Sequence, residues 1–196
     1  MHRLAAGFIL GYHGCTKVVA EKLLRGAAFR ISRNDYDWLG SGIYFWGANP
    51  VRGLAYAKEM IRRRRGAGTD RSGPAVVGAV IDLGLCLDLT TQAGLASVKR
   101  AHGSLETLAE MSGRPLPRNS PDLPLRRLDC AVINHAHYMR RVGNEPAVQT
   151  VRGVFIEGGG LYPGTQISEK THIQIAVVDP GCIKGVFRVR SADLRS

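Results

Sequence analysis

Residues 7–14 have the sequence GFILGYHG, an apolar run that ends in a histidine and a glycine. The run Gly7–Tyr12 predicts a buried strand that ends at His13-Gly14. Thr16 then suits the N-cap of a helix, and Gly26 lies where a left-handed residue can end one. This stretch therefore predicts a strand, a tight turn and a helix in close succession at the start of the fold.

Outward from this stretch, apolar periodicity and turn residues predict the other elements. Residues 30–42 are polar and aromatic, which is typical of a loop. Further strands are predicted over 43–46, 75–89 with a bend at Gly84, 153–156, 171–178 and 183–189. Helices are predicted from 49 to about 65, from about 91 to 111 and over 125–142, with loops at 66–73 and 113–124. Helices gather in the first two-thirds and strands close the chain, so we expect an α+β fold.

Size and charge set limits on organisation and partners. With 196 residues, 44% of them apolar, the chain can bury a core, and we expect a single domain over 1–196. The net charge of +11, from 27 Lys and Arg against 16 Asp and Glu, favours an acidic partner such as nucleic acid or an anionic cofactor. The run Arg62–Arg65 is either a solvated helix end or a nucleic-acid contact.

The cysteines and the amino terminus bear on metals and on location. The four cysteines, at 15, 86, 130 and 182, have no CxxC pair and no histidine at zinc-finger spacing, so we expect neither a metal site nor a disulfide framework. The apolar patch Leu4–Leu10 is too short to span a bilayer and lacks a small-residue cleavage site. We therefore expect free thiols, no signal peptide, no membrane segment and a cytoplasmic location.

The histidine-glycine pair is the first candidate for binding chemistry. Gly14 has no side chain, so a ligand can reach its backbone, and the His13 imidazole can donate a hydrogen bond. Tyr44 lies further along, in Gly40-Ser41-Gly42-Ile43-Tyr44-Phe45, where two glycines allow a turn that brings an aromatic ring against a flat ligand. A structural histidine and a tyrosine packed in the core are the alternatives, and these residues alone do not decide between the two interpretations.

The predicted strand Thr171–Val177 carries two polar side chains at alternate positions. Alternation places its two isoleucines on one face and His172 and Gln174 on the other. Such a pair is either exposed to solvent or directed into a cleft. Both side chains are therefore candidates for a site.

Taken together, Tyr12-His13-Gly14, Gly40-x-Gly42-Ile43-Tyr44-Phe45 and a helix containing Ala55-Tyr56-Ala57 resemble the ADP-ribosyltransferase superfamily, in its diphtheria-toxin-like and poly(ADP-ribose) polymerase branch. Val80–Gly84 looks like the strand that this family places after its tyrosine helix, and the closing strand follows in the same order. The resemblance implies a split α+β core of two packed, mainly antiparallel sheets with flanking helices. It also implies a pocket for NAD, used as a substrate, with no metal.

The resemblance assigns roles to the first two motifs. His13 would hydrogen-bond the adenosine-side ribose of NAD, and the Gly14 backbone would hold the nicotinamide amide. Tyr44, followed by Phe45 as a further cofactor-binding residue, would stack on the nicotinamide ring, because a flat cationic ring is well matched to a phenol face. Loss of nicotinamide then develops positive charge at the ribose anomeric carbon, which the acceptor attacks from the opposite face.

The third family residue is commonly a glutamate on a late strand, and Gln174 stands at that position here. A neutral amide can hold a ribose hydroxyl, but it stabilises a cation less than a carboxylate does and cannot act as a base. Glu169 is the second candidate for the missing carboxylate, if the loop 157–170 folds over the cleft. His172 lies where relatives often have a residue that selects the acceptor, so it is a substrate-side candidate.

The loop between the histidine and tyrosine motifs corresponds to the segment with which the family covers bound NAD. Ser32 and Tyr36 offer hydroxyl and aromatic groups to ribose, phosphate or adenine, and Arg33 suits the pyrophosphate because a guanidinium fork matches phosphate oxygens. The same loop offers further candidates of these kinds: Arg30, Asn34, Asp35, Asp37 and Trp38. An ordinary surface loop is the alternative for many of them.

The expected function is transfer of ADP-ribose from NAD to a protein or nucleic-acid acceptor. By analogy with the fold, such a compact enzyme suits a bacterial toxin or defence effector, with an antitoxin or inhibitor as a further partner. NAD hydrolysis, with water as the acceptor, is the first alternative, because Gln174 cannot activate an acceptor hydroxyl. A non-catalytic module that binds NAD, ADP-ribose or nucleic acid is the second.

Overall fold

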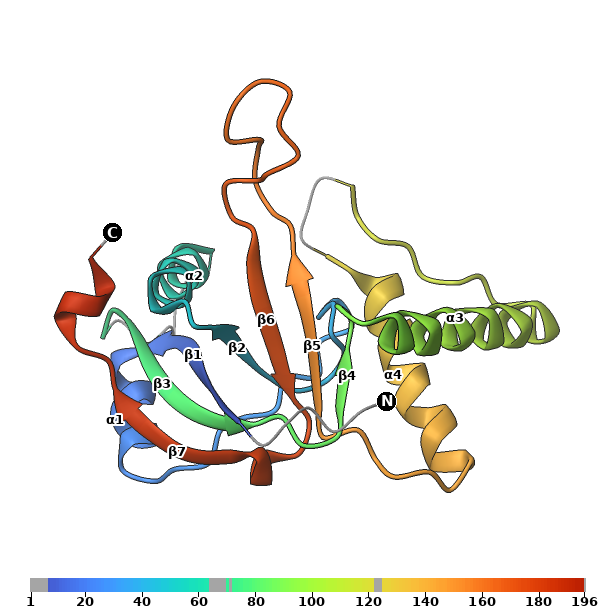
Figure 1. The fold of residues 1–196 in the computed structure, drawn as a ribbon, viewed down its shortest axis with the longest axis horizontal. Coiled ribbons are helices and arrows are strands. Elements are labelled where there is room, and N and C mark those ends of the chain that lie inside the picture. The colour runs from blue at the N-terminus through green and yellow to red at the C-terminus, as the bar shows by residue number, and fades with distance from the viewer. Residues whose placement is uncertain (1–6, 64–69, 71, 122–124, 196) are drawn as a thin grey trace.

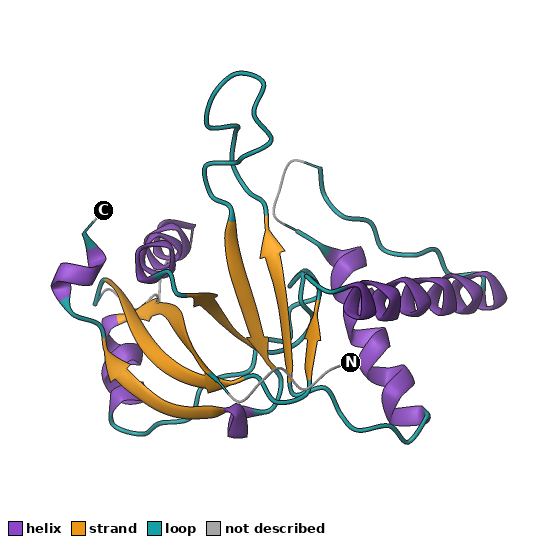
Figure 2. Ribbon diagram, in the orientation of Figure 1, coloured by secondary structure: helices purple, strands orange, loops and turns teal. Residues whose placement is uncertain are grey.

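The computed structural model describes residues 7–63, 70, 72–121 and 125–195. Within them, seven strands form one mixed sheet in the order β4-β5-β6-β2-β1-β3-β7, and four α-helices pack around it (Figures 1 and 2). The expected α+β class is therefore confirmed. No helix in these segments is long and apolar enough to cross a membrane.

The elements match the predicted ones closely. The strands are β1 Phe8–Thr16, β2 Ile43–Gly47, β3 Pro74–Asp82, β4 Cys86–Asp88, β5 Thr150–Phe155, β6 His172–Val177 and β7 Ile183–Arg188. The helices are α1 Lys17–Leu24, α2 Pro50–Arg63, α3 Gln92–Ser112 and α4 Arg127–Val142, with 3-10 turns at Pro180–Cys182 and Ser191–Leu194. Some predicted stretches lie partly outside the described residues: the apolar patch at 4–6, the arginine run at 64–65, and the loops at 66–69, 71 and 122–124.

Local chemistry explains where several helices begin. The Thr16 hydroxyl accepts a hydrogen bond from the Val19 amide at the start of α1, and Thr91 caps α3 in the same way. The Asn49 side chain accepts from the Arg52 amide at 2.9 Å at the start of α2. The predicted bend at Gly84 divides the strand 75–89 into β3 and β4, and its φ of +53° is a backbone conformation that suits glycine.

Strand β1 is longer than predicted, since it continues through His13 and Gly14 to Thr16. The reason is its ladder with β3, which pairs every residue from Phe8 to Thr16. The expected tight turn after His13 is therefore wrong, and the two motif residues lie inside the sheet. This is the one boundary that changes how the site is built.

The strands do not form the two separate sheets that the resemblance implies, because one sheet contains all seven. Its two parts are nevertheless weakly joined: β1 and β2 pair only at Gly11–Gly47 and Tyr12–Trp46. Figure 1 shows the β1-β3-β7 part curving away from the β4-β5-β6-β2 part. We call this junction between β1 and β2 the seam.

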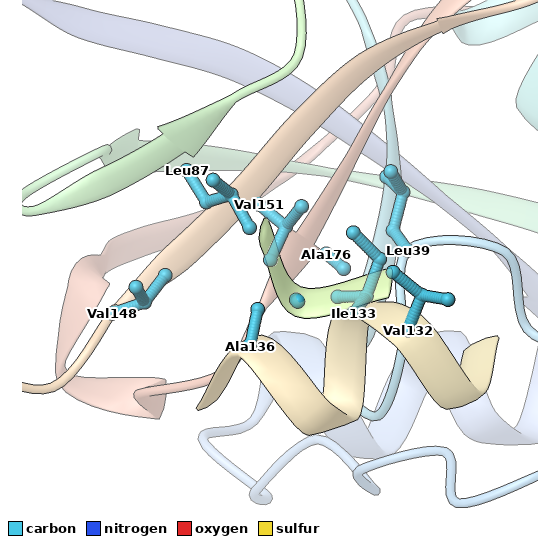
Figure 3. Packing of buried hydrophobic residues seen from close by; sticks show 9 residues of the cluster. Leu39, Leu87, Val132, Ile133, Ala136, Val148, Val151 and Ala176 are labelled. Carbon is cyan, nitrogen blue, oxygen red and sulfur yellow. The ribbon is translucent and has the colours of Figure 1, made fainter. Parts of the chain in front are cut away.

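Two clusters of buried apolar residues pack on the two faces of strands β2 and β6. One lies beneath α3 and α4 and is drawn in Figure 3: Leu39, Leu87, Ala101, Val132, Ile133, Ala136, Val148, Val151 and Ala176. The other lies on the opposite face and combines residues of β2, β3 and β6, including Phe45, Ile81 and Ile175. Both parts of the sheet therefore share one core, which fixes the geometry at the seam.

Candidate functional site

The seam is the place where the backbone ladder of the sheet stops. Antiparallel pairing between β1 and β2 ends at Tyr12–Trp46, although the next residues of both strands are still extended. Continued pairing would bring Gly14 opposite Tyr44. These are two of the residues that the sequence singled out, so the predicted motifs meet where the sheet opens.

Beyond this point the His13 side chain, and not the β1 backbone, bonds the β2 backbone. The His13 Nδ1 atom lies 2.9 Å from the Tyr44 carbonyl oxygen, and because a carbonyl only accepts, Nδ1 carries the proton. The ring packs against Phe29 and Phe45, with centroid distances of 5.3 and 5.6 Å. Burial lowers the pKa of His13, so the ring is neutral and its Nε2 atom has a lone pair that can accept a hydrogen bond.

Gly14 directs its backbone into the seam. Successive residues of a strand point their N–H and C=O groups to alternate neighbours, and the Leu10 carbonyl accepts from the Ala48 amide on the β2 side at 2.9 Å. Gly14 has the same parity as Leu10, so its N–H and C=O also face β2. A donor and an acceptor side by side are the complement of a carboxamide.

Helix α2 explains why residue 14 is a glycine. A Cβ atom at Gly14 would lie 2.3 Å from the Gly53 carbonyl oxygen of α2, which no side chain can accept without a shift. Gly53 in turn lies against Tyr12 and Trp46. Helix α2 therefore covers the face of the sheet that carries Gly14.

Tyr44 is held by the loop that precedes it. Its hydroxyl donates to the Gly40 carbonyl at 2.8 Å and accepts from the Leu39 amide at 3.0 Å. Burial is the main cause that raises its pKa well above the ordinary value, so the phenol stays neutral. With the hydroxyl committed to the loop, only the ring of Tyr44 is available to a flat ligand. The ring packs beside the α3–α4 cluster, whereas the adjacent Phe45 points to the opposite face with His13.

Strand β6 carries Gln174 and His172 on the Tyr44 face, as predicted from their alternation. Gln174 pairs with Trp46 of β2 and Gly153 of β5, and its side-chain oxygen accepts from the Trp38 indole at 2.5 Å. His172 is only 6% exposed, so the alternative of an exposed strand histidine is wrong. Its ring lies near those of Trp46 and Phe155, with Nδ1 on the Lys170 carbonyl, and burial is the main cause that lowers its pKa.

The loop before Tyr44 binds mainly to itself and to α4. The Ser32 hydroxyl donates to Asp37, and Asn34 donates to Ser32. The Arg126 amide of the α4 N-cap donates to the Tyr36 carbonyl. The remaining polar side chains predicted here, Arg30, Arg33, Asp35 and Tyr36, are exposed, and Asp35 pairs with Arg127 at 3.0 Å. The structure thus holds this loop in place and leaves Arg33 and Tyr36 on its surface.

Glu169 is not brought to Gln174. It is exposed on the hairpin loop 156–171, which projects beyond β5 and β6 (Figure 1), and its amide donates to the Gly159 carbonyl. The carboxylate near the base of that loop is Glu157, which pairs with Arg52 of α2 at 2.7 Å. Glu59 and Lys170 extend this pair into a network of four charges. No sequence pattern predicts this network, because Arg52 and Glu157 are far apart in the chain.

Two more residues of the site were missed or assigned differently from sequence. Asn134 of α4 accepts from the Ser41 amide at 3.0 Å and so fixes the Gly40–Gly42 turn beside Tyr44. Trp38, expected only as a residue of the loop that covers NAD, instead contacts Gln174 directly. A polar residue on the inner face of an amphipathic helix is the signal that could have identified Asn134.

The seam is distinct from a cavity at the start of β1. This cavity has a volume of about 280 Å³, and its lining includes Phe8, Ile9, Asp82 and Arg152. In the described part of the chain, no three His, Cys, Asp or Glu side chains come together as metal ligands would. Comparisons of the chain with the known protein families, with the curated proteins and with the solved structures find no match.

Proposed function

We propose that the seam binds NAD and that the chain transfers ADP-ribose from it to a macromolecular acceptor. One observation carries the proposal: the β1–β2 ladder stops beside Gly14, whose N–H and C=O face the opening while His13 occupies the Tyr44 carbonyl. Backbone groups of a strand need partners, so a break of this kind suits a ligand with a complementary donor and acceptor. The nicotinamide carboxamide is such a ligand.

Neighbouring side chains support the same ligand. The Tyr44 ring offers an aromatic face on the side of the sheet to which Gly14 belongs, and His13 has a neutral Nε2 that can accept from a ribose hydroxyl. Gln174 lies on the strand next to β2, on the Tyr44 face. The resemblance to ADP-ribosyltransferases assigns these same residues to NAD.

Gln174 also favours a second function, NAD hydrolysis or NAD binding without transfer. A carboxamide does not carry the charge that stabilises a developing ribosyl cation and cannot remove a proton from an acceptor hydroxyl. Transfer therefore depends on an acceptor that reacts without help from residue 174. The net charge of +11 makes nucleic acid a favourable acceptor, and a protein is the alternative.

Labelled NAD distinguishes these functions in one experiment. The full chain is incubated with NAD labelled in the ADP-ribose part, with and without cellular protein or nucleic acid, and both released nicotinamide and label on polymer are measured. Label on polymer supports transfer, and its sensitivity to nuclease or protease identifies the acceptor. Nicotinamide release without labelling indicates hydrolysis. Thermal protection by NAD with neither product indicates a binding module, and absence of protection contradicts an NAD site.

Gln174→Glu is the informative variant for the reaction. If the seam positions NAD as proposed, a carboxylate at residue 174 should raise nicotinamide release about tenfold or more, because it adds charge stabilisation in the transition state. Tyr44→Ala in the same background serves as the control and should abolish the gain by weakening NAD binding. No change in release from Gln174→Glu, in a protein that NAD still protects, would contradict the proposed place of residue 174.

A further inference from the structure

Trp38 makes a close and directional contact with Gln174. The indole Nε1 lies 2.5 Å from the Gln174 Oε1 atom. The indole also covers Gly153, where a Cβ atom would lie 2.6 Å from the Trp38 ring, and it packs on Phe155 at a centroid distance of 5.0 Å. A larger residue than glycine at 153 would displace the indole, so the backbone itself makes room for this contact.

The indole N–H determines which atom of the Gln174 carboxamide contacts Trp38. An indole N–H is a donor and has no acceptor atom, so the group that Gln174 presents to it must be the amide oxygen. Gly153 pairs with Gln174 from the β5 side, and Trp46 pairs with it from the β2 side. With its oxygen bonded to the indole, the carboxamide has its NH₂ group left to offer to another partner, and β2, the neighbouring strand on the Trp46 side, borders the seam.

We propose that Trp38 is a positioning residue that fixes the Gln174 carboxamide and so makes residue 174 a hydrogen-bond donor toward the ligand in the seam. This inference rests on the proposed function for its ligand, but not for its geometry. A donor at this place pairs with an oxygen of the ligand, such as a ribose hydroxyl oxygen. The usual glutamate would present an acceptor there instead.

The loop gives Trp38 a fixed position. The residues that follow it, Leu39 and Gly40, bond the Tyr44 hydroxyl on β2, and Ser41 bonds Asn134 on α4. Trp38 itself packs against the α3–α4 cluster. The orientation of Gln174 is therefore set by a loop that is tied both to the sheet and to a helix.

Nuclear magnetic resonance tests the contact without any ligand. The chain has two tryptophans, so ¹⁵N-labelled protein gives two indole N–H signals, and Trp46→Phe assigns them. We expect Gln174→Met, which keeps the length of the side chain but removes its oxygen acceptor, to move the Trp38 indole proton upfield and to speed its exchange with water. An unchanged Trp38 signal in Gln174→Met would overturn the proposal.

A double-variant comparison separates positioning from simple support of the fold. Trp38→Phe should lower the rate constant of nicotinamide release about fivefold in the wild-type background, with NAD affinity within about twofold, because the freed amide can flip. In the Gln174→Glu background the same change should have less than about a twofold effect, since both carboxylate oxygens are acceptors. Equal losses in the two backgrounds would mean that Trp38 only supports the fold, and would overturn the proposal.

The two measurements keep this inference apart from the proposed function. If NAD neither binds nor reacts while the Trp38 signal still responds to Gln174→Met, the proposed function fails and the fixed carboxamide stands. If NAD reacts while the Trp38 signal does not respond, the inference fails and the proposed function stands. Should Trp38→Phe not fold, the indole signal of the wild-type and Gln174→Met proteins still decides the matter.

Discussion

The two edges of strand β1 differ sharply. On one edge β1 pairs with β3 along its whole length, from Phe8 to Thr16. On the other edge it pairs with β2 at two positions only, after which a histidine side chain makes the connection. The complete ladder ties β1 into the core, and the incomplete one turns the N–H and C=O of Gly14 toward the opening beside β2. One edge of β1 is thus fully paired in the sheet, while its other edge borders the candidate site.

The two edges of β1 also explain why the imidazole of His13 and the bare backbone of Gly14 lie together at the seam. If His13 did not hold the Tyr44 carbonyl, that oxygen would be open to the Gly14 amide, and the ladder would close. The imidazole thus bonds the Tyr44 carbonyl of β2 at the place where continued pairing would bring the Gly14 amide. Its lowered pKa keeps the ring in the neutral form, with a defined donor and acceptor.

The largest expected effect is at the point where the open edge meets α2. Gly14→Ala should lower the free energy of unfolding by roughly 2–3 kcal/mol, because its Cβ would be forced against the Gly53 carbonyl. NAD binding should be lost as well. Urea unfolding and thermal protection by NAD measure the two effects.

Gly185→Ala is the matched control, since a Cβ at this strand glycine meets nothing within 4 Å. Its free energy of unfolding should stay within about 0.5 kcal/mol of wild type. Equal effects of the two substitutions would show that the crowding at Gly14 is not special to the seam.

Tyr44→Phe sharpens the comparison by removing the hydroxyl and leaving the ring. The Gly40 carbonyl and the Leu39 amide each lose a partner, so the free energy of unfolding should fall by about 1–2 kcal/mol. NAD affinity should change less than about threefold, because the ring that stacks is retained. Isothermal titration of NAD together with urea unfolding checks this, and a large loss of affinity would mean that the hydroxyl itself contacts the ligand.

Mild acid should lower the stability of the protein, and the buried His13 is one cause. The pKa of His13 is lowered from its ordinary 6.5, so below that pH the unfolded chain takes up a proton that the folded chain resists. The stabilisation is present above 6.5 and is lost as the pH falls. Between about pH 7 and pH 5.5 this histidine should cost about 1 kcal/mol of stability, and His137 and His172 act in the same direction.

Urea unfolding at the two pH values measures this loss, and His13→Gln should reduce it. A stability that rises on acidification would contradict a neutral His13 in the folded protein. The carboxylates with lowered pKa, such as Glu157, act only nearer their ordinary value of 4.5, which is why the window ends above that value.

Much of the fold could be predicted because periodicity and capping are local. Thr16 predicted the start of the first helix, the helices predicted from residue 49 and from about residue 91 are both present, and the bend predicted at Gly84 lies between β3 and β4. The end of β1 could not be predicted, because the ladder with β3 extends it through a His-Gly pair that otherwise suits a turn. Tertiary pairing decided that boundary.

For the candidate site, too, the features set by local sequence could be predicted, and the contacts between distant segments could not. Alternation along β6 correctly placed His172 and Gln174 on one face, since that depends on the strand alone. It could not show that Trp38 lies against Gln174 or that Asn134 holds the turn at Ser41, because those contacts join segments that are distant in the chain. Whether residues of this kind bind NAD stays a prediction that the experiments above test.

The four-charge network at the base of the hairpin loop has a consequence for the approach of a large partner. It joins two cations, Arg52 and Lys170, to two anions, Glu59 and Glu157, so its formal charges cancel. The network itself therefore contributes almost no net field at distances beyond a Debye length. A polyanion attracted by the +11 net charge would therefore be steered by other surfaces of the molecule and not by this neutral network.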